Sequence, residues 1–285
     1  MERFGLFNRE AVCAELHGEN RARLTRLCLL ERVESTNLEL LRIPDPDRHG
    51  SVVLADRQTS GRGRYGKSWY SPGGANIYLS LGWTFEQAPK VLTSMPLAMS
   101  ISLARALLRA GLPNPGVKWP NDLLVDGKKL AGILVEARRS GNGQVTTVVG
   151  LGVNVRMPDT PTARNEIDQD WTDVCSHVPG PADAGFRDRL SGMIIDEVFR
   201  GLAEFTSGGF RPFEPDWQKR DVLRGEAVCV SGPSGSACGR YAGISPGGGL
   251  LLHLDSNKGK TVQREYRAGE VSVRALPVGP VNRPA

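Results

Sequence analysis

The sequence lacks any apolar run close to the ~20 residues that a membrane-spanning helix requires. Its first ten residues, MERFGLFNRE, also lack the apolar stretch of a secretory signal peptide. We therefore expect a cytoplasmic protein that has no membrane as a partner.

Cysteine is scarce and its spacing is uninformative. The five cysteines form no CxxC pair and their number is odd, so neither a disulfide framework nor a zinc site is predicted. The four histidines also lack metal-ligand spacing. Free, buried thiols are the expectation for all five positions: Cys13, Cys28, Cys175, Cys229 and Cys238.

A long basic run is missing too. The 36 Lys and Arg exceed the 31 Asp and Glu by a net charge of +5, and this excess is spread along the chain. The distribution argues against a dedicated nucleic-acid arm and leaves room for a local anion site, so no DNA partner is expected. With 40% hydrophobic and 24% charged residues among 285, the composition is that of a globular protein with one large and one small domain.

The hydrophobic pattern divides the chain into four parts: an N-terminal segment of unclear structure (1–27), a large domain (28–220), a small domain (221–276) and a tail (277–285). Alternating and buried runs predict strands, and helical spacing predicts two long helices. The predicted strands of the large domain include 27–33, 51–58, 76–85 and 145–156, and the predicted helices are 95–111 and 184–205. The large domain is therefore predicted to be α/β (α+β) with a mixed β-sheet.

The small domain has a different sequence pattern from the large one. About five short β-like runs alternate with glycine and proline turns, which is typical of a small SH3-like β-barrel. In the N-terminal segment only one short helix, within residues 8–17, is predicted. A helix-turn-helix module with its wing contains three helices of ~11 residues and needs roughly twice the length of the segment 1–27. We therefore expect no such DNA-binding module in this segment.

Glycine and positive charge are concentrated between residues 58 and 78, QTSGRGRYGKSWYSPGGANIY. Five glycines surround Arg62, Arg64 and Lys67, and glycine lets backbone N–H groups approach a ligand closely. Guanidinium groups bind carboxylate or phosphate oxygens in pairs. Because predicted strands flank this stretch, it is interpreted as a ligand lid. Such loops also occur as solvated connections and as RNA-binding segments.

The stretch Glu34-Ser35-Thr36-Asn37 links a predicted strand to a predicted helix. Ser35 or Thr36 would serve as the helix N-cap, and this interpretation is favoured when the stretch is taken alone. The functional alternative is that these hydroxyls face a polar ligand at the end of the strand.

A second motif, VKWPNDLLVDGKKLAGILVE, covers residues 117–136. Asp126-Gly127 predicts a two-residue hairpin turn that brings Lys128 and Lys129 near Asn121 and Asp122. Alternation along a strand puts the two lysines on opposite faces. It does not decide which of them faces the cleft.

Together, GRGRYGKSWYSPGGANIYLS and KWPNDLLVDGKKLAGILVE closely resemble the signatures of biotin protein ligases (biotin–acetyl-CoA-carboxylase ligases). The resemblance continues through ESTN, GLGVN and GEVSVR and covers roughly residues 28–275. It implies a catalytic domain on a mixed sheet followed by a small C-terminal β-barrel. The short N-terminal segment places the chain with the monofunctional class, which has no N-terminal DNA-binding domain.

The resemblance implies a two-step reaction that uses ATP, Mg²⁺ and biotin. Biotin is activated as biotinyl-5′-AMP and then transferred to a lysine of a biotin carboxyl carrier protein, from acetyl-CoA carboxylase or a related carboxylase. Alternatives are a lipoate or octanoate ligase or transferase of the same fold, and, in another class, a nucleic-acid-binding regulator. Family members include monomers and homodimers, so the resemblance leaves the oligomeric state open.

Site residues follow from motif position. The resemblance implies that Lys129, Arg62, Arg64 and Asp122 are catalytic, with Asp122 either orienting the acceptor lysine or assisting a metal that is otherwise bound through the ATP phosphates. The implied biotin-binding residues are Ser35, Thr36, Asn37, Gln58, Gly61, Arg62, Gly63, Arg64, Lys129 and Gly132. The implied nucleotide-binding residues are Arg64, Lys67, Trp69, Asn76, Asn121 and Asn154.

Overall fold

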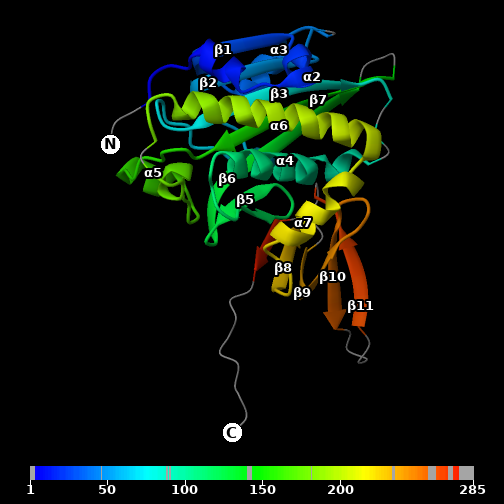
Figure 1. The fold of residues 1–285 in the computed structure, drawn as a ribbon. Helices are drawn as coiled ribbons and strands as arrows, with labels where there is room; N and C mark the ends of the chain where they lie inside the picture. The colour runs from blue at the N-terminus through cyan, green and yellow to red at the C-terminus, as the bar shows by residue number, and fades with distance from the viewer. Residues whose placement is uncertain are drawn as a thin grey trace.

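Two β-sheets organise the chain in a computed structural model, which describes residues 4–275 apart from 46, 88, 90, 140–142, 181, 233–234, 256–260 and 269–271. The first sheet has seven strands in the order β1-β2-β3-β7-β6-β5-β4, and the second has five in the order β11-β10-β9-β8-β12 (Figure 1). In the first sheet β1 and β2 are parallel and the other neighbours are antiparallel, so the predicted mixed sheet is confirmed. The second sheet is antiparallel throughout. Its SH3-like form stays a prediction, and the predicted tail lies outside the described residues.

The elements occur in chain order as follows. The strands of the first sheet are β1 (Arg26–Val33), β2 (Ser51–Gln58), β3 (Ile77–Phe85), β4 (Gly116–Lys118), β5 (Asp122–Val125), β6 (Lys128–Arg139) and β7 (Val145–Val153). Those of the second sheet are β8 (Ala227–Gly232), β9 (Gly235–Ile244), β10 (Leu250–Asp255), β11 (Thr261–Tyr266) and β12 (Ser272–Ala275). The α-helices are α1 (Arg9–Ala14), α2 (Gly18–Arg23), α3 (Thr36–Arg42), α4 (Met95–Arg109), α5 (Pro161–Glu166), α6 (Phe186–Gly208) and α7 (Glu214–Arg220).

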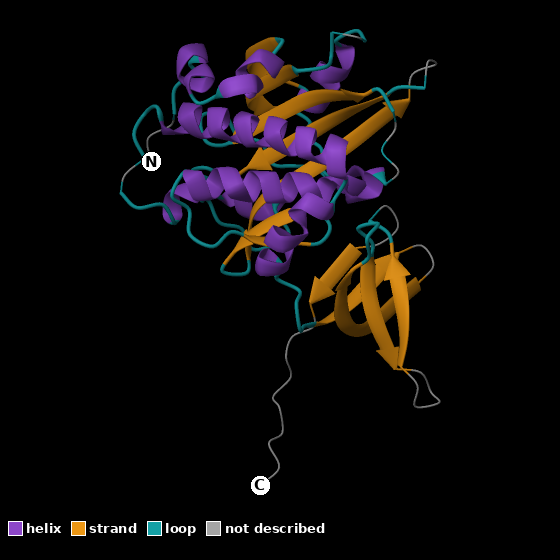
Figure 2. Ribbon diagram, turned by 45° about the vertical axis from the view of Figure 1, so that its right-hand side comes forward, coloured by secondary structure: helices purple, strands orange, loops and turns teal. Residues whose placement is uncertain are grey.

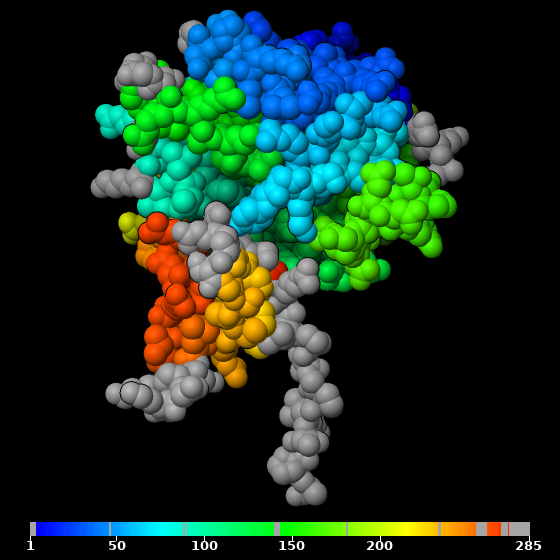
Figure 3. Space-filling view, turned by 180° about the vertical axis from the view of Figure 1, so that it is seen from behind, coloured from blue at the N-terminus to red at the C-terminus, as the bar shows by residue number. Residues whose placement is uncertain are grey.

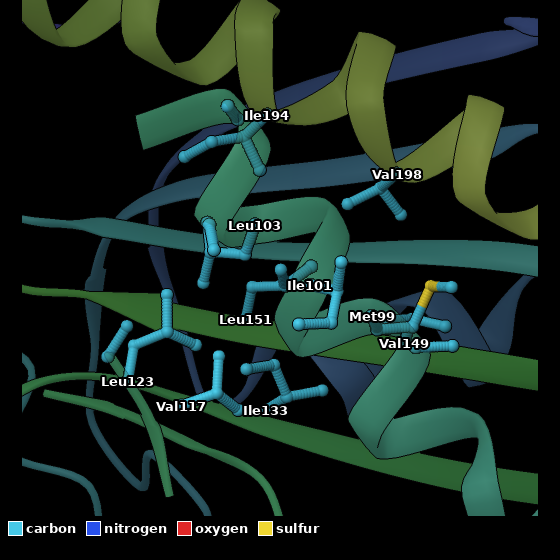
Figure 4. Close-up of a cluster of buried hydrophobic side chains, with 14 of the residues drawn as sticks. Met99, Ile101, Leu103, Val117, Leu123, Ile133, Val149, Leu151, Ile194 and Val198 are labelled. Atoms are coloured by element: carbon cyan, nitrogen blue, oxygen red, sulfur yellow. The ribbon is translucent and has the colours of Figure 1, made fainter. Parts of the chain in front are cut away.

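Helices α4 and α6 cover one face of the first sheet (Figures 1 and 2). The two helices lie side by side, with α6 against β3 and α4 against β4, β5 and β6. Ile101 and Leu103 of α4 lie among the buried side chains between this helix and the sheet (Figure 4). Alternation along β2 sends Val52 and Leu54 to this core and Val53 to the opposite face. There Val53 packs against α3, so the two faces are covered by different elements. Among the described helices, none has the length and apolarity needed to cross a bilayer.

The N-terminal segment packs on the first sheet's helical layer. The described part of residues 1–27 forms α1 and α2, which both contact α6. The backbone N–H of His17 and the amide of Asn20 donate to the carboxylate of Asp196 on α6, at 3.1 and 3.0 Å. Burial alone would raise the pKa of Asp196, but these hydrogen bonds and Arg109 outweigh burial and lower it. The segment is therefore held by a buried carboxylate rather than lying loose.

The prediction of free thiols is wrong for Cys229 and Cys238, which form a disulfide between β8 and β9. The two cysteines are direct cross-strand partners in the antiparallel register, with their Cα atoms 4.0 Å apart. Sequence spacing did not reveal this pairing because it depends on the register of the hairpin. Cys13, Cys28 and Cys175 are free, as predicted, but they are half-buried rather than buried.

A buried ion pair joins α6 to the end of β2. Arg187, 1% exposed, donates to the carboxylate of Asp56 at 2.7 Å and also to the carbonyl oxygen of Gly5. The same carboxylate accepts the backbone N–H of Gly74 at 3.0 Å. The ring of Phe7 lies 3.9 Å from the guanidinium carbon of Arg187. One arginine thus ties together the N-terminal segment, α6 and the loop that follows β2.

We predict that Arg187→Met lowers the free energy of unfolding by about 3–5 kcal/mol, because it leaves a buried carboxylate without its cation. Urea unfolding followed by circular dichroism measures this change. The matched control is Arg164→Met, whose exposed pair with Asp159 should leave the midpoint unchanged. An Arg187→Met variant as stable as the wild type would show that the ion pair does not hold these elements.

Candidate active site

A cavity of about 720 Å³ opens on the sheet face that α4 and α6 leave uncovered. The segment between β2 and β3 (the β2–β3 loop, residues 59–76) reaches across this face, light blue in Figure 3. Three separate stretches of chain supply most of the wall: the start of α3, the β2–β3 loop, and the hairpin of β5 and β6. The second sheet contributes Val273. The predicted site residues that line it are Ser35, Thr36, Asn37, Gln58, Arg62, Gly63, Arg64, Lys67, Trp69, Asn121, Asp122, Lys129 and Gly132.

The floor of the cavity is a strip of sheet without side chains. Gly132 of β6 is the register partner of Gly152 of β7, and the indole of Trp69 lies directly on both. A Cβ at Gly152 would lie 2.5 Å from the Trp69 ring, and one at Gly132 would lie 3.1 Å from it. Glycine is required here because the loop approaches the strands so closely.

A β-bulge decides which lysine faces the cavity. The register pairs Leu123 with Ala131 but Leu124 with Lys129, so β6 has one extra residue, Leu130, at this point. The bulge resets the alternation and puts Lys129 on the same face as Gly132. Lys129 Nζ lies 3.0 Å from Asp122 Oδ1 and 5.3 Å from the centroid of the Trp69 ring. Lys128, in contrast, is exposed and does not line the cavity.

One end of the cavity is polar and buried. Ser35, 3% exposed, occupies the N-cap position of α3 but makes no side-chain capping bond. Instead, the carboxamide oxygen of Gln58 accepts the backbone N–H of Thr36 at 2.9 Å, and the Gln58 amide donates to Ser71 Oγ at 3.0 Å. The helix is therefore capped from β2, and Ser35 lines the cavity, where its binding of a polar ligand stays a prediction.

Asn37 is fixed by two neighbours in the sheet. Ser80 Oγ lies 2.6 Å from Asn37 Oδ1, and Asn37 Nδ2 donates to Glu136 Oε2 at 2.7 Å. Gly150 accommodates this side chain, since a Cβ there would lie 2.2 Å from Asn37 Oδ1. The amide is held rigidly at the edge of the floor.

The positively charged side chains of the β2–β3 loop contact oxygen atoms of other side chains. Arg62 Nη1 lies 3.4 Å from Glu136 Oε1, and Lys67 Nζ lies 3.8 Å from Asp168 Oδ2. Arg64 Nη1 donates to Asn121 Oδ1 at 3.1 Å. The loop closes on itself through backbone bonds from Gly63 N–H to the Lys67 carbonyl and from Trp69 N–H to the Gly61 carbonyl. It is an ordered, hydrogen-bonded turn in this state.

A smaller pocket of about 60 Å³ adjoins the main cavity. Trp69, Lys129, Asn154 and Trp171 are among its walls. The amide of Asn154 donates to the carbonyl of Thr172 at 3.0 Å, which secures the chain around Trp171 to the end of β7. Two indole rings and a lysine thus border one recess, whose other walls are mostly polar.

Two of the predicted site residues do not reach either pocket. Asn76 is fully buried, where its oxygen accepts the Val155 backbone N–H at 2.9 Å, so its environment is that of a strand-linking residue. Gly61 is also buried, and a Cβ there would lie 2.4 Å from the carbonyl oxygen of Trp69. Its contribution is to let the loop fold back on itself.

Several residues of this region were missed from the sequence. Ser80 and Glu136 lie inside strands, where a period-two pattern marks only their face, and Trp171 follows a polar stretch without recognisable periodicity. Tyr65, in the loop, was passed over between Arg64 and Gly66. Ser80 and Glu136 lie on the same face of the sheet as the cavity glycines. That shared face could have identified them, but it can be recognised only once the register between the strands is known.

The arrangement suits chemistry between anions. Arg62, Arg64, Lys67 and Lys129 line one cavity whose far end holds buried hydroxyl and amide groups. At ~4 Å two unit charges repel by about 4 kcal/mol at an effective dielectric near 20, and fixed cations offset such repulsion. A ligand with a polar group at one end and an anionic group at the other fits this arrangement.

Comparison with known proteins agrees with this geometry. Residues 29–154 match the biotin/lipoate A/B protein ligase family. The chain is 31% identical to the biotin–[acetyl-CoA-carboxylase] ligase of Paracoccus denitrificans over 228 residues, which cover 79% of this chain and 92% of that protein. It is also 31% identical to the bifunctional ligase/repressor BirA of Escherichia coli, covering 95% of this chain and 79% of BirA.

A solved structure has the same fold. The biotin protein ligase of Aquifex aeolicus, in complex with biotin and ATP, superposes with a TM-score of 0.71 at 27% identity, covering 88% of this chain and 99% of that one. The sequence identity to the named ligases extends over most of their length as well as over most of this chain. The chain therefore belongs to the biotin protein ligase family, within the wider group of biotin/lipoate A/B protein ligases.

Proposed function

We propose that this protein is a biotin–[biotin carboxyl carrier protein] ligase that activates biotin with ATP and transfers it to a lysine of the carrier. The observation that carries the proposal is the convergence of Lys129, Arg62 and Arg64 on one cavity that ends in buried polar groups. Residues 28–220 would form the catalytic domain and residues 221–276 a smaller C-terminal domain. The protein would act in the cytoplasm.

In the first step a biotin carboxylate oxygen forms a bond to the α-phosphorus of ATP, and pyrophosphate leaves. Lys129 is held at 3.0 Å from Asp122 and would face the carboxylate and α-phosphate, where its charge opposes their repulsion. Arg62 and Arg64 would exchange their present partners, Glu136 and Asn121, for ligand oxygens. Trp69, Asn121 and Asn154 would bind the nucleotide, with the recess beside Trp171 as the candidate place for its base.

In the second step the neutral amine of the carrier lysine attacks the acyl carbon, and AMP leaves. Water competes for the same mixed anhydride, so the β2–β3 loop would cover the intermediate. The carrier would approach where Asp122 and the hairpin of β5 and β6 meet the open mouth of the cavity.

Selectivity for biotin would come from the polar end of the cavity. Ser35, Thr36 and Asn37 are buried and would pair with the ureido ring. A lipoyl or octanoyl chain would offer no partner to the Ser35 hydroxyl, which makes no capping bond, and an unpaired buried group costs about 1–3 kcal/mol. This feature favours biotin over the lipoate and octanoate alternatives.

Magnesium would enter together with ATP. Within the described residues no cluster of three or more His, Cys, Asp or Glu side chains is arranged to hold a metal ion. One carboxylate plus substrate phosphates is a normal ligand set for Mg²⁺, and Asp122 at the cavity wall fits that role. Bound there, the ion would neutralise phosphate charge.

The direct test of the function incubates the protein with ATP, Mg²⁺, biotin and a biotin carboxyl carrier domain, and detects the product with streptavidin. Biotin-dependent exchange of label between pyrophosphate and ATP tests the first step alone. Replacing biotin by lipoate in that exchange separates the two ligase classes. Exchange with lipoate and none with biotin would overturn the proposal.

We predict that Lys129→Ala lowers the exchange rate at least 100-fold, the equivalent of ~2.7 kcal/mol, because it removes a preorganised charge from the reacting anions. Lys128→Ala is the matched control, since the neighbouring lysine of the same hairpin is exposed and outside the cavity. Near-normal exchange in Lys129→Ala would remove this lysine from the mechanism.

Asp122→Asn separates the two roles that its motif position implies. If the carboxylate serves the metal and Lys129, we expect slower pyrophosphate exchange and a higher Mg²⁺ concentration for half-maximal rate. The ion pair at 3.0 Å favours this result. Unchanged exchange with slower transfer to the carrier would instead assign Asp122 to the acceptor lysine.

Arg64→Ala is expected to release the adenylate prematurely, because the loop loses its charged contact with the intermediate. Indiscriminate biotinylation of bystander lysines, detected with streptavidin on a mixture of unrelated proteins, measures this release. Arg138→Ala on β6 is the control, as its exposed side chain lies outside the cavity. Equal retention of adenylate by Arg64→Ala and the wild type would contradict the prediction.

A further inference from the structure

Tyr65 connects the predicted phosphate-binding arginine to the second sheet. Its phenol oxygen accepts a hydrogen bond from Arg64 Nη2 at 2.9 Å and lies 2.9 Å from the carbonyl oxygen of Ala268, to which it donates. Ala268 follows β11 and packs against the main core. The phenol O–H thus donates its single proton to the second sheet, while the phenol oxygen accepts a hydrogen bond from the arginine.

The conformation of Tyr65 is unusual for its residue type. Its φ is 58°, in the left-handed region that non-glycine residues rarely adopt, and its ring is 56% exposed. Burial of the ring therefore does not account for this backbone conformation. The turn around it is closed by backbone bonds between Gly63, Arg64 and Lys67, and in this conformation the Arg64 guanidinium carbon lies 4.8 Å from the Tyr65 ring centroid, in addition to the two side-chain hydrogen bonds.

Arg64 is held from two sides as a result. Asn121 is the partner on the first sheet, and its own amide donates to the Ile133 carbonyl at 2.7 Å, which fixes its oxygen toward Arg64. Tyr65 is the partner toward the second sheet. That sheet is itself anchored beside the cavity, since Trp119 Nε1 donates to the Gly248 carbonyl at 2.9 Å.

We propose that Tyr65 is a positioning residue that fixes Arg64 over the cavity by tying it to the carbonyl of Ala268. The expected effect of Tyr65 on catalysis rests on the proposed function. Its effect on the position of Arg64 rests only on the contacts described above. On this inference, the second sheet helps to position the Arg64 guanidinium that would bind the phosphate. Tyr65 does not touch the reacting atoms; it acts through Arg64.

The kinetic test compares Tyr65→Phe with the wild type in biotin-dependent pyrophosphate exchange. We expect kcat to fall about tenfold, equivalent to ~1.4 kcal/mol, while the KM for biotin changes little because Ser35 and Gln58 still line the far end. The control is Tyr266→Phe, which removes a buried phenol oxygen that has no hydrogen-bond partner among the described residues. In an Arg64→Ala background, Tyr65→Phe should have no further effect.

Limited trypsin digestion tests the positioning without relying on activity. Trypsin cleaves after Arg62, Arg64 and Lys67 only where the backbone can leave its hydrogen-bonded turn, and loss of the tether should loosen that turn. Tyr65→Phe should therefore be cleaved faster in the loop than the wild type or Tyr266→Phe. If the wild type shows no biotin-dependent exchange, the proposed function fails and digestion alone decides the inference. Wild-type cleavage rates in Tyr65→Phe, or an undiminished kinetic effect of Tyr65→Phe in the Arg64→Ala background, would overturn it.

Discussion

The site depends on one steric constraint: a seven-stranded sheet must bury one face under helices and keep a bare strip on the other. Gly132 and Gly152 provide the strip, and the contact of Trp69 with both of them brings the β2–β3 loop down onto the strands. Side chains at these positions would fill the space that a ligand and the loop share. The bulge at Leu130 follows from the same need, because it turns Lys129 toward that strip while Leu130 and Ala131 both stay in the core.

The positively charged side chains of the site are paired with oxygen atoms of the protein itself. Four of the cations that line the cavity already meet a protein oxygen: Arg62 meets Glu136, Arg64 meets Asn121, Lys67 meets Asp168 and Lys129 meets Asp122. Like charges therefore stand close together without strong mutual repulsion. The carboxylates of Glu136 and Asp122 are partly exposed, so separating them from their cations costs less than breaking a fully buried pair.

Much of this fold could be predicted from the sequence because its strongest signals are local. The strand Ser51–Gln58 and the helix starting at Met95 occur where the pattern placed them, and Asp126-Gly127 forms the predicted turn with both φ angles positive. The choice between Lys128 and Lys129 could not be made, since a bulge breaks the alternation on which that choice rests. The Cys229–Cys238 bond and the inward faces of Ser80 and Glu136 were missed for a related reason: each depends on register between strands.

The strand order has a consequence for synthesis of the chain. Strand β3 pairs with β7, which lies about 70 residues later in the sequence, and Arg187 reaches back 131 residues to Asp56. The bare strip does not exist until β7 has inserted between β3 and β6. A nascent polypeptide emerging from the ribosome therefore carries the basic loop and β3 for about 70 further residues before the strand that joins them to the hairpin of β5 and β6 has been made.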